Sequence, residues 1–455
     1  MLTSRRRGRC LTRAAAVTLA LLTVLAVLAV LAATAATAAP PARVPAARSP
    51  AAGVSSPRAA VAATLRSTDP PPEIRPTEQA QLAAIGVTAA WRITRGNGVT
   101  VGVLDSGADP TAPDLAGSVT VGPDYTQGAD PPGYQPPHLH GTYIASLIAG
   151  HGSGPGDAGG IIGVAPAATI LSVRVIPDDQ EPGFATYNAK STFDEAIGDG
   201  IRYAVSHGAS VINMSLGGET PIRNLRAAVG YAIAHDVVVV AAAGNDGATT
   251  SGYTPYSYPA AFPGVISVGA AGTNGRRAFF SDRNASVVIL APGVNVIGAG
   301  PGGSYLQGSG TSPASAFVAG VAALIRSRYP RLSPVQVEQA VISSAADRPS
   351  GGYRPDVGFG EVNAPAALSA AARLAATAPA SGLAAGSRFG SPPGPIQVVH
   401  RDKARIDGYG VAGAVLALAV LVLLTWAGVR IRRSRSDRAG RPVPGGASQQ
   451  LAEPH

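Results

Sequence analysis

The stretch GSGTSPASAFVAG at residues 308–320 is the part of this chain from which its fold can be worked out. The glycines before Ser312 indicate a loop, and the small and apolar residues after it allow a helix to begin inside a packed interior. Pro313 suits the first helical turn, where an N–H has no intrahelical acceptor. Amides at a helix start favour negative charge, so the Ser312 hydroxyl would lie beside donors suited to an oxyanion. The stretch fits a nucleophile as well as an ordinary helix cap.

On both sides of this stretch, apolar β-rich runs alternate with helical patterns. Such alternation predicts an α/β fold with a parallel sheet that is covered on both faces. In such sheets, ligands bind beyond the carboxyl ends of the strands. We expect strands at 99–104, 170–175, 210–214, 236–241, 265–268 and 287–290, and helices at 77–85, 140–148, 192–207, 222–234, 312–328 and 333–344.

Polar residues stand at the ends of these elements, where a site would form. Asp105 follows the strand at 99–104, and His140 opens a helical pattern. Acyl transfer to a serine needs a histidine that takes the serine proton and a buried carboxylate that fixes the histidine tautomer. With Ser312 as the serine, the chain order Asp, His, Ser is the one known from subtilisin. Asn245 also follows a buried strand, and its amide is a candidate donor to the oxyanion.

Four motifs carry a family resemblance over about residues 76–368. In chain order they are VLDSG at 103–107, HGT at 140–142, AAGN at 242–245 and GTS at 310–312. Further landmarks are GVAP at 163–166, NMSLG at 213–217 and YPA at 258–260. On these motifs the chain resembles the subtilisin-type serine peptidases.

The resemblance implies a subtilisin-like three-layer fold and a serine endopeptidase that acts on proteins or peptides without a cofactor or a metal. One segment of such a site pairs with the substrate backbone, a form of β-augmentation, and a second lines the other side of the first specificity pocket. The residues implied for catalysis are Asp105, His140, Ser312 and Asn245. Those implied for substrate binding are Ser215, Leu216 and Gly217 in the first segment, and Ala242, Ala243 and Gly244 in the second.

The narrower resemblance is to the mycosins, membrane-anchored subtilisin-like peptidases associated with type VII secretion in actinobacteria. The chain departs from subtilisins at Tyr143, where they commonly have His, and at 313–316, where PASA replaces Met-Ala-Ala-Pro. Mycosins generally carry cysteines for a disulfide, and none follows Cys10 here. Residues 40–75 are too short for the folded inhibitory pro-domain of typical subtilisins, so we do not expect activation by removal of one.

The charge distribution excludes a nucleic-acid partner and points to a membrane. Five arginines before the first apolar run and six after the last, against two acids, account for the whole formal charge of +9. Residues 14–429 are therefore formally neutral, and the basic residues mark membrane flanks. With 46% hydrophobic and only 14% charged residues, the chain is apolar for a soluble protein.

The ends of the chain predict export and a membrane anchor. Residues 1–39 have the layout of a secretory signal peptide, although the long apolar run also fits an uncleaved anchor. The apolar run at 411–429 is long enough to span a bilayer, and the basic residues after it favour a cytoplasmic tail and an external globular domain. The predicted organisation is a signal peptide at 1–39, a linker at 40–75, a peptidase domain at 76–370, a linker at 371–410, a transmembrane helix at 411–429 and a tail at 430–455.

The leading hypothesis is an extracytoplasmic, membrane-anchored serine endopeptidase that works with type VII secretion components. The alternative is a structural component that stabilises a secretion complex, with proteolysis secondary or absent. His138 lies close to His140 but outside the motif, so we interpret it as a loop residue. Asn213 fits a core hydrogen-bonding role or a place beside the active site. The acidic run at 178–181 lacks a recognisable ligand spacing for calcium and is interpreted as a solvated loop.

Overall fold

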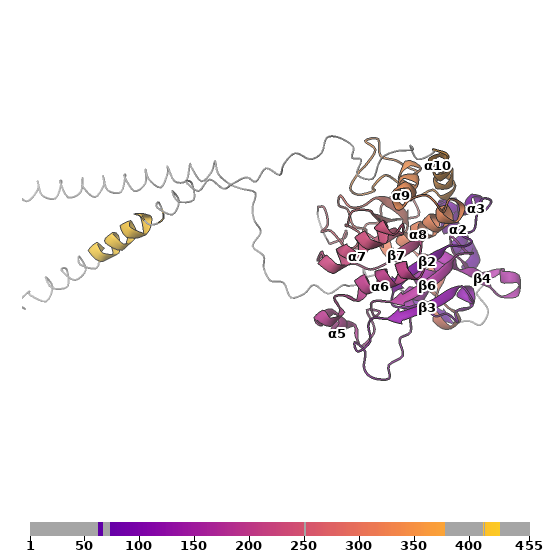
Figure 1. Ribbon diagram of the computed structural model, residues 1–455, viewed down its shortest axis with the longest axis horizontal. Helices are drawn as coiled ribbons and strands as arrows, with labels where there is room; N and C mark the ends of the chain where they lie inside the picture. Colours follow the sequence, from indigo (N-terminus) through magenta and orange to yellow (C-terminus); the bar gives the residue numbers. More distant parts are fainter. Residues whose placement is uncertain (1–61, 67–72, 250–251, 378–412, 414, 428–455) are drawn as a thin grey trace, which may run out of the picture. The chain divides into compact units, whose positions relative to one another are not determined.

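The computed structural model describes residues 62–66, 73–249, 252–377, 413 and 415–427. The chain is divided into two compact units, Met1–Ala378 and Pro379–His455. The first unit holds the sheets and the helices that surround them, coloured from indigo to orange in Figure 1.

The centre of the first unit is a seven-stranded sheet in which every neighbouring pair of strands is parallel. Its strand order is β10-β9-β8-β7-β2-β6-β3, which places β2 between β7 and β6. The predicted α/β class with a mainly parallel sheet is confirmed. The strands are β2 (Thr100–Asp105), β3 (Val119–Asp124), β6 (Thr169–Arg174), β7 (Val211–Met214), β8 (Val238–Ala242), β9 (Val265–Ala271) and β10 (Ile289–Pro292).

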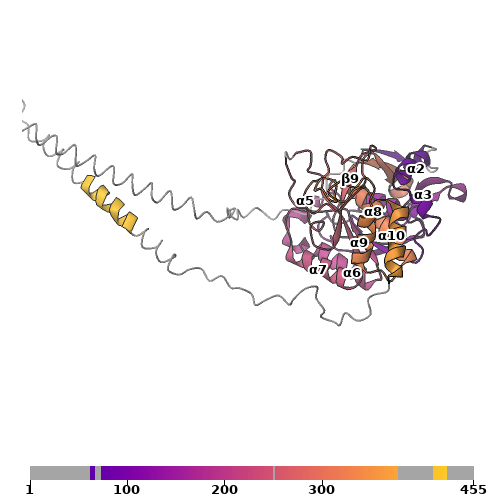
Figure 2. The ribbon, with the colours of Figure 1, turned by 90° about the horizontal axis from the view of Figure 1, so that it is seen from above.

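Helices cover both faces of this sheet, and the alternation of side chains along each strand separates two cores. In β8, Val239 belongs to one core, whereas its neighbours Val238 and Val240 belong to the other. One core is shared with α6 and α7, which pack side by side, and the other with α4 and α8 (Figures 1 and 2). Because both faces are buried, the inner strands are mostly apolar, whereas the edge strand β3 is partly exposed. These helices are α4 (Leu139–Ala149), α6 (Ala196–Ser206), α7 (Arg223–Ala234) and α8 (Thr311–Arg328).

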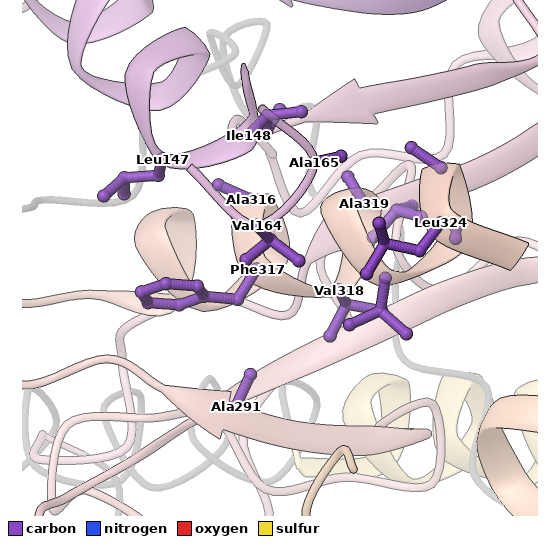
Figure 3. Packing of buried hydrophobic residues seen from close by; sticks show 14 of the residues in the cluster. Leu147, Ile148, Val164, Ala165, Ala291, Ala316, Phe317, Val318, Ala319 and Leu324 are labelled. Carbon is purple, nitrogen blue, oxygen red and sulfur yellow. The ribbon is translucent and has the colours of Figure 1, made fainter. Parts of the chain in front are cut away.

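Helix α8 runs through the larger core, and every residue from 311 to 326 is buried. A helix in such a position needs small or apolar side chains on most of its surface, and its buried serine and threonine residues, Thr311, Ser312 and Ser315, lie in its first two turns. Figure 3 shows its side chains packed with Ile148 of α4 and Ala291 of β10. Gly320 permits a close approach, because a Cβ there would lie 2.5 Å from the Cβ of Val164.

Smaller elements surround the central sheet. One antiparallel sheet has the order β1-β12-β11, and β4 pairs with β5. Strand β1 lies inside the predicted linker at 40–75, and its partner β12 is far away in the sequence, so local composition does not reveal the pairing. The elements are β1 (Ala62–Arg66), β4 (His151–Ser153), β5 (Gly159–Ile162), β11 (Val296–Ala299), β12 (Ser304–Gly308), α2 (Ile74–Ala84), α3 (Val87–Ala90), α5 (Phe184–Ala189), α9 (Pro334–Ser343) and α10 (Ala364–Ala376).

The folded part extends beyond the predicted domain bounds of 76–370 at both ends. Helix α2 begins at Ile74, and α10 continues to Ala376. The sequence of α10 is rich in alanine, which we interpreted as the start of a linker, but alanine is also the strongest helix former. Asn363 caps this helix, because its side chain accepts a hydrogen bond from the amide of Ala366 at 3.0 Å.

In the second unit, residues 413 and 415–427 are helical, and the described side chains there are exposed. Within the described ranges, no helix is both long enough and apolar enough to cross a membrane. The transmembrane helix predicted at 411–429 is therefore not confirmed. The predicted signal peptide and cytoplasmic tail lie outside the described residues, as do the linker residues from 378 to 410.

Candidate active site

The structure brings Asp105 and His140 into direct contact. Asp105 is the last residue of β2, and His140 is the second residue of α4. Nδ1 of His140 lies 2.7 Å from Oδ1 of Asp105, and both side chains are buried. Gly141 makes the approach possible, because a Cβ at this position would lie 2.0 Å from the carbonyl oxygen of Gly107. Helix α4 thus packs directly on the loop that follows Asp105.

The electrostatics of this pair favour a protonated imidazole. Burial disfavours the charged form of His140, but the charge of Asp105 and its hydrogen bond act in the opposite direction. The charges of Asp178 and Asp179 add to this effect, and the balance raises the pKa of His140 from 6.5 to about 9. An imidazolium formed here is stabilised, which is what a general base needs after it has taken a proton.

Ser312 lies in the first turn of α8 and is fully buried. Its hydroxyl donates to the carbonyl oxygen of Ser215 at 3.3 Å. Ser215 directly follows β7, the neighbour of β2 in the sheet, so Ser312 is fastened beside the strand that ends in Asp105. Among the described residues, Nε2 of His140 is buried without a hydrogen-bond partner, and the structure shows no hydrogen bond between it and Ser312.

Asn245 is held in one orientation by the residue before Ser312. Its Oδ1 accepts from the backbone amide of Thr311 at 2.9 Å and from the Thr311 hydroxyl at 3.1 Å. The same hydroxyl accepts from the amide of Gly244 at 3.2 Å. In the described part of the chain, Nδ2 of Asn245 is buried without an acceptor. This orientation leaves an amide donor for a negatively charged oxygen near Ser312.

The two implied substrate-binding segments follow neighbouring strands. Ser215, Leu216 and Gly217 come after β7 and lie outside any strand, and the next residue, Gly218, forms an antiparallel bridge with Tyr258. Ala242 ends β8, and Ala243 and Gly244 follow it. Because β7 and β8 are adjacent and parallel, the two segments emerge at the same edge of the sheet.

A buried polar network lies beneath the nucleophile candidate. Ser215 Oγ contacts Ser315 Oγ at 3.0 Å and donates to the carbonyl oxygen of Ser312 at 3.1 Å. Asn213 donates to Ser215 Oγ at 3.0 Å. The Ser215 side chain therefore points toward α8. In this network, Asn213 is linked to Ser312 through the Ser215 hydroxyl. Ser315, at one of the departures from subtilisins, also donates to the carbonyl oxygen of Ser312 at 2.8 Å.

The interpretation of 178–181 as a solvated loop fits Asp179 and Gln180, which are exposed, but is wrong for Asp178 and Glu181. Asp178 and Glu181 are only 7% and 4% exposed. Glu181 contacts Arg174, which also pairs with Asp124 and Asp130. Because Arg174 compensates the charge of Glu181, this carboxylate can be buried. Within the described residues, no group of three or more histidine, cysteine, aspartate or glutamate side chains is arranged to hold a metal ion.

His138 stays apart from the Asp105–His140 pair. It is the N-cap residue of α4 with a left-handed backbone conformation, φ 57°. Its Nδ1 lies 2.8 Å from the carbonyl oxygen of Ser106, and its ring lies against Gly107. Its contacts are therefore with the backbone of the loop after Asp105.

This arrangement of fold and site belongs to a known class. The model of the subtilase family matches residues 96–360, more than half of the chain, and the chain belongs to this family. The resemblance derived from the motifs is thereby confirmed.

Two curated relatives show the extent of the similarity. Subtilisin E of Bacillus subtilis (strain 168) is 38% identical over 250 residues, which are 55% of this chain and 61% of the relative. The subtilisin of Bacillus pumilus is 38% identical over 272 residues, covering 60% of this chain and 91% of the relative. The chain thus spans less than two thirds of the length of subtilisin E.

Solved structures agree with this assignment. Fervidolysin from Fervidobacterium pennivorans, described as a keratinolytic enzyme related to subtilisin, is similar with a TM-score of 0.53 and 31% identity, over 64% of this chain and 45% of that one. The mycosin MycP1, with its N-terminal propeptide removed, is similar with a TM-score of 0.53 and 27% identity, over 64% of this chain and 96% of that one.

Proposed function

We propose that this chain is a serine endopeptidase in which Asp105, His140 and Ser312 form the catalytic triad. The observation that carries the proposal is the 2.7 Å hydrogen bond between Asp105 and His140, combined with the unpartnered Nε2 of His140 at a site that includes the start of α8. Asp105 fixes the tautomer in which Nδ1 carries the proton, so Nε2 is the atom that can accept one. Membership of the subtilase family supports the same assignment.

In the first step, Ser312 attacks the carbonyl carbon of the scissile peptide bond. Its hydroxyl turns from the Ser215 carbonyl toward His140, and Nε2 takes the proton as the new C–O bond forms. The carbonyl oxygen becomes an oxyanion, to which Asn245 Nδ2 and the Ser312 amide donate.

In the second step, the C–N bond breaks and His140 gives its proton to the leaving amine. An acyl-enzyme on Ser312 remains. A water molecule then loses a proton to His140 and attacks the ester, and return of that proton to Ser312 releases the new carboxyl terminus. During these steps the segment at 215–217 pairs with the substrate backbone, and the segment at 242–244 lines the other side of the first specificity pocket. No step requires a cofactor.

The cellular role we propose is that of a membrane-anchored, extracytoplasmic peptidase associated with type VII secretion components. The apolar run at 411–429 and the signal-like residues 1–39 support the location, and the similarity to MycP1 supports the association. A role as a structural component of the secretion complex predicts that a strain carrying Ser312→Ala secretes normally. A proteolytic role predicts that this strain resembles the deletion strain.

The test of the activity is hydrolysis of quenched fluorescent peptides by the full chain and by Ser312→Ala. We expect the substitution to remove about a factor of 10⁶ in kcat, the order found when the serine of such a triad is removed. Equal hydrolysis by both proteins would contradict the proposal.

A further inference from the structure

The helix that carries His140 is not capped by its own N-cap residue. His138 occupies that position, and its side chain makes no capping hydrogen bond. Instead, the amide of Leu139 donates to Asp178 Oδ2 at 3.0 Å, and the amide of His140 donates to Asp178 Oδ1 at 3.3 Å. Asp178 lies in the loop after β6, and both of its oxygens are thus used on the first turn of α4.

A second link runs through Ser106, the neighbour of Asp105. The Ser106 hydroxyl accepts from the amide of Gly141 at 3.0 Å, and Ser106 also favours the charged form of the Asp178 carboxylate. Three successive amides of α4 are therefore held from outside the helix, two by Asp178 and the third by Ser106. The orientation of this first turn sets where the His140 imidazole lies.

Asp178 is itself fixed in place. Its amide donates to Glu181 Oε1 at 3.1 Å, and Glu181 contacts Arg174 at the end of β6. Arg174 also pairs with Asp124 and Asp130, at 3.0 Å each. The Asp178 carboxylate is thus held by a buried ionic network that is anchored on the central sheet.

The charged groups that act on His140 are Asp105, Asp178 and Asp179. The remaining ring beside it, Tyr143, has its centroid 6.4 Å away and donates its hydroxyl proton to Val296. Asp178 is buried, so its charge is screened less by salt than that of the exposed Asp179. It also lies at the positive end of the α4 dipole, where a carboxylate is favourable.

We propose that Asp178 is a positioning residue for His140: it caps the first turn of α4 from another loop and so holds the imidazole against Asp105. This inference rests on the proposed function, because it makes Asp178 the support of the general base. It also explains why the Asp178 side chain is buried in a loop whose next two residues are exposed.

The first test compares Asp178→Asn with the matched control Asp179→Asn. The amide side chain keeps one acceptor for the cap but removes the charge, whereas Asp179 acts on His140 by its charge and, in the described part of the chain, forms no hydrogen bond or ion pair with α4. We expect the pKa of His140, read from its imidazole proton resonances by NMR, to fall by roughly one unit in Asp178→Asn and by much less in Asp179→Asn. The acid limb of kcat/KM should shift with it.

The second test is Asp178→Ala, which removes both acceptors. We expect kcat to fall by about tenfold or more with KM little changed, because the His140 ring moves while the substrate-binding segments do not. Partial recovery of kcat in Asp178→Asn would support the capping role. Circular dichroism establishes that each variant is folded.

Two results would overturn the inference. One is an equal shift of the His140 pKa in Asp178→Asn and Asp179→Asn. The other is a rise in KM at constant kcat in Asp178→Ala, which would place Asp178 in substrate binding. The NMR titration does not depend on turnover, so an inactive wild-type protein would refute the proposed peptidase activity while the role of Asp178 was still measured.

Discussion

Asp105 Oδ1 and His140 Nδ1 lie 2.7 Å apart, although 35 positions separate the two residues in the sequence. The contact forms because the end of β2, at Asp105, lies beside the first turn of α4, which carries His140. It fixes Nδ1 as the protonated nitrogen and leaves Nε2 as the acceptor. The predictions for the pH profile, Asp105→Asn and Gly141→Ala depend on this contact.

The activity should depend on the pKa of His140. A general base must be neutral, and Asp105 and its neighbours raise the pKa of His140 to about 9, so the imidazolium persists to higher pH than usual. We expect kcat/KM to be low at acidic pH and to rise with pH, with an acid limb well above the ordinary value of 6.5. A pH profile with its limb at or below 6.5 would contradict this assignment.

Replacement of Asp105 by Asn should reduce kcat by about 10⁴, because the amide favours the wrong tautomer of His140. The acid limb should also move to lower pH, since the charge that raises the pKa is lost. The control is Asp199→Asn on α6, whose side chain is 49% exposed. We expect this control to leave the pH profile unchanged. A wild-type pH profile in Asp105→Asn would show that Asp105 does not act on His140.

Asn245→Ala should act on the transition state alone. Loss of one oxyanion donor costs about 10²–10³ in kcat in subtilisin, and we expect the same order here with KM unchanged. Steady-state kinetics measures both constants. The exposed Asn274, changed to Ala, serves as the control. A change in KM with kcat intact would remove Asn245 from the oxyanion site.

Gly141→Ala should disrupt the site through the backbone. The new Cβ would meet the Gly107 carbonyl oxygen at 2.0 Å, so α4 and His140 must move away from Asp105. We expect a loss of about 10² in kcat. The control Gly230→Ala is exposed in α7, where a Cβ meets nothing within 4 Å, and it should stabilise the protein by about 0.5–1 kcal/mol without affecting kcat. Full activity in Gly141→Ala would show that the close approach is not needed.

Glu78 should make the protein less stable as pH rises. Burial raises its pKa to about 8, against the hydrogen bond from Ile162 and the charge of Arg75. The folded carboxyl keeps its proton to about pH 8, whereas the unfolded one loses it near 4.5, so unfolding releases a proton between these values. The free energy of unfolding therefore falls as pH rises through this window.

Glu78→Gln removes this ionisation. Calorimetry at pH 5 and pH 8 should show a Tm gain over wild type that is larger at pH 8. The exposed Glu195→Gln should show no such difference. The same gain at both pH values would mean that Glu78 is not responsible.

Local sequence patterns predicted six of the seven strands of the central sheet because these strands are buried on both faces, whereas the partly exposed edge strand β3 was not predicted. The runs at 99–104 and 236–241 correspond closely to β2 and β8, and the helix expected at 312–328 is α8 with one additional residue at its start. The pattern of apolar residues within each segment was enough to predict these elements, without knowledge of contacts between distant segments. The roles of the site residues remain predictions that the variants above test.

Features that depend on distant contacts could not be predicted in this way. Strand β1 exists by pairing with β12, and Glu181 in the run at 178–181 can be buried because Arg174 balances its charge. Nothing near Asp178 in the sequence shows that it caps a helix that begins 39 residues earlier. When the partners of a buried carboxylate come from another segment, the local sequence looks like that of a surface loop.

The central claim is that Ser312 is the nucleophile, and reaction of the native protein with a fluorophosphonate probe tests it most directly. Mass spectrometry of the labelled protein should place one adduct on Ser312. Ser312→Ala should give no adduct, and Asp105→Asn should react much more slowly. Labelling that persists in Ser312→Ala, or that lies on another serine of the native protein, would contradict the account.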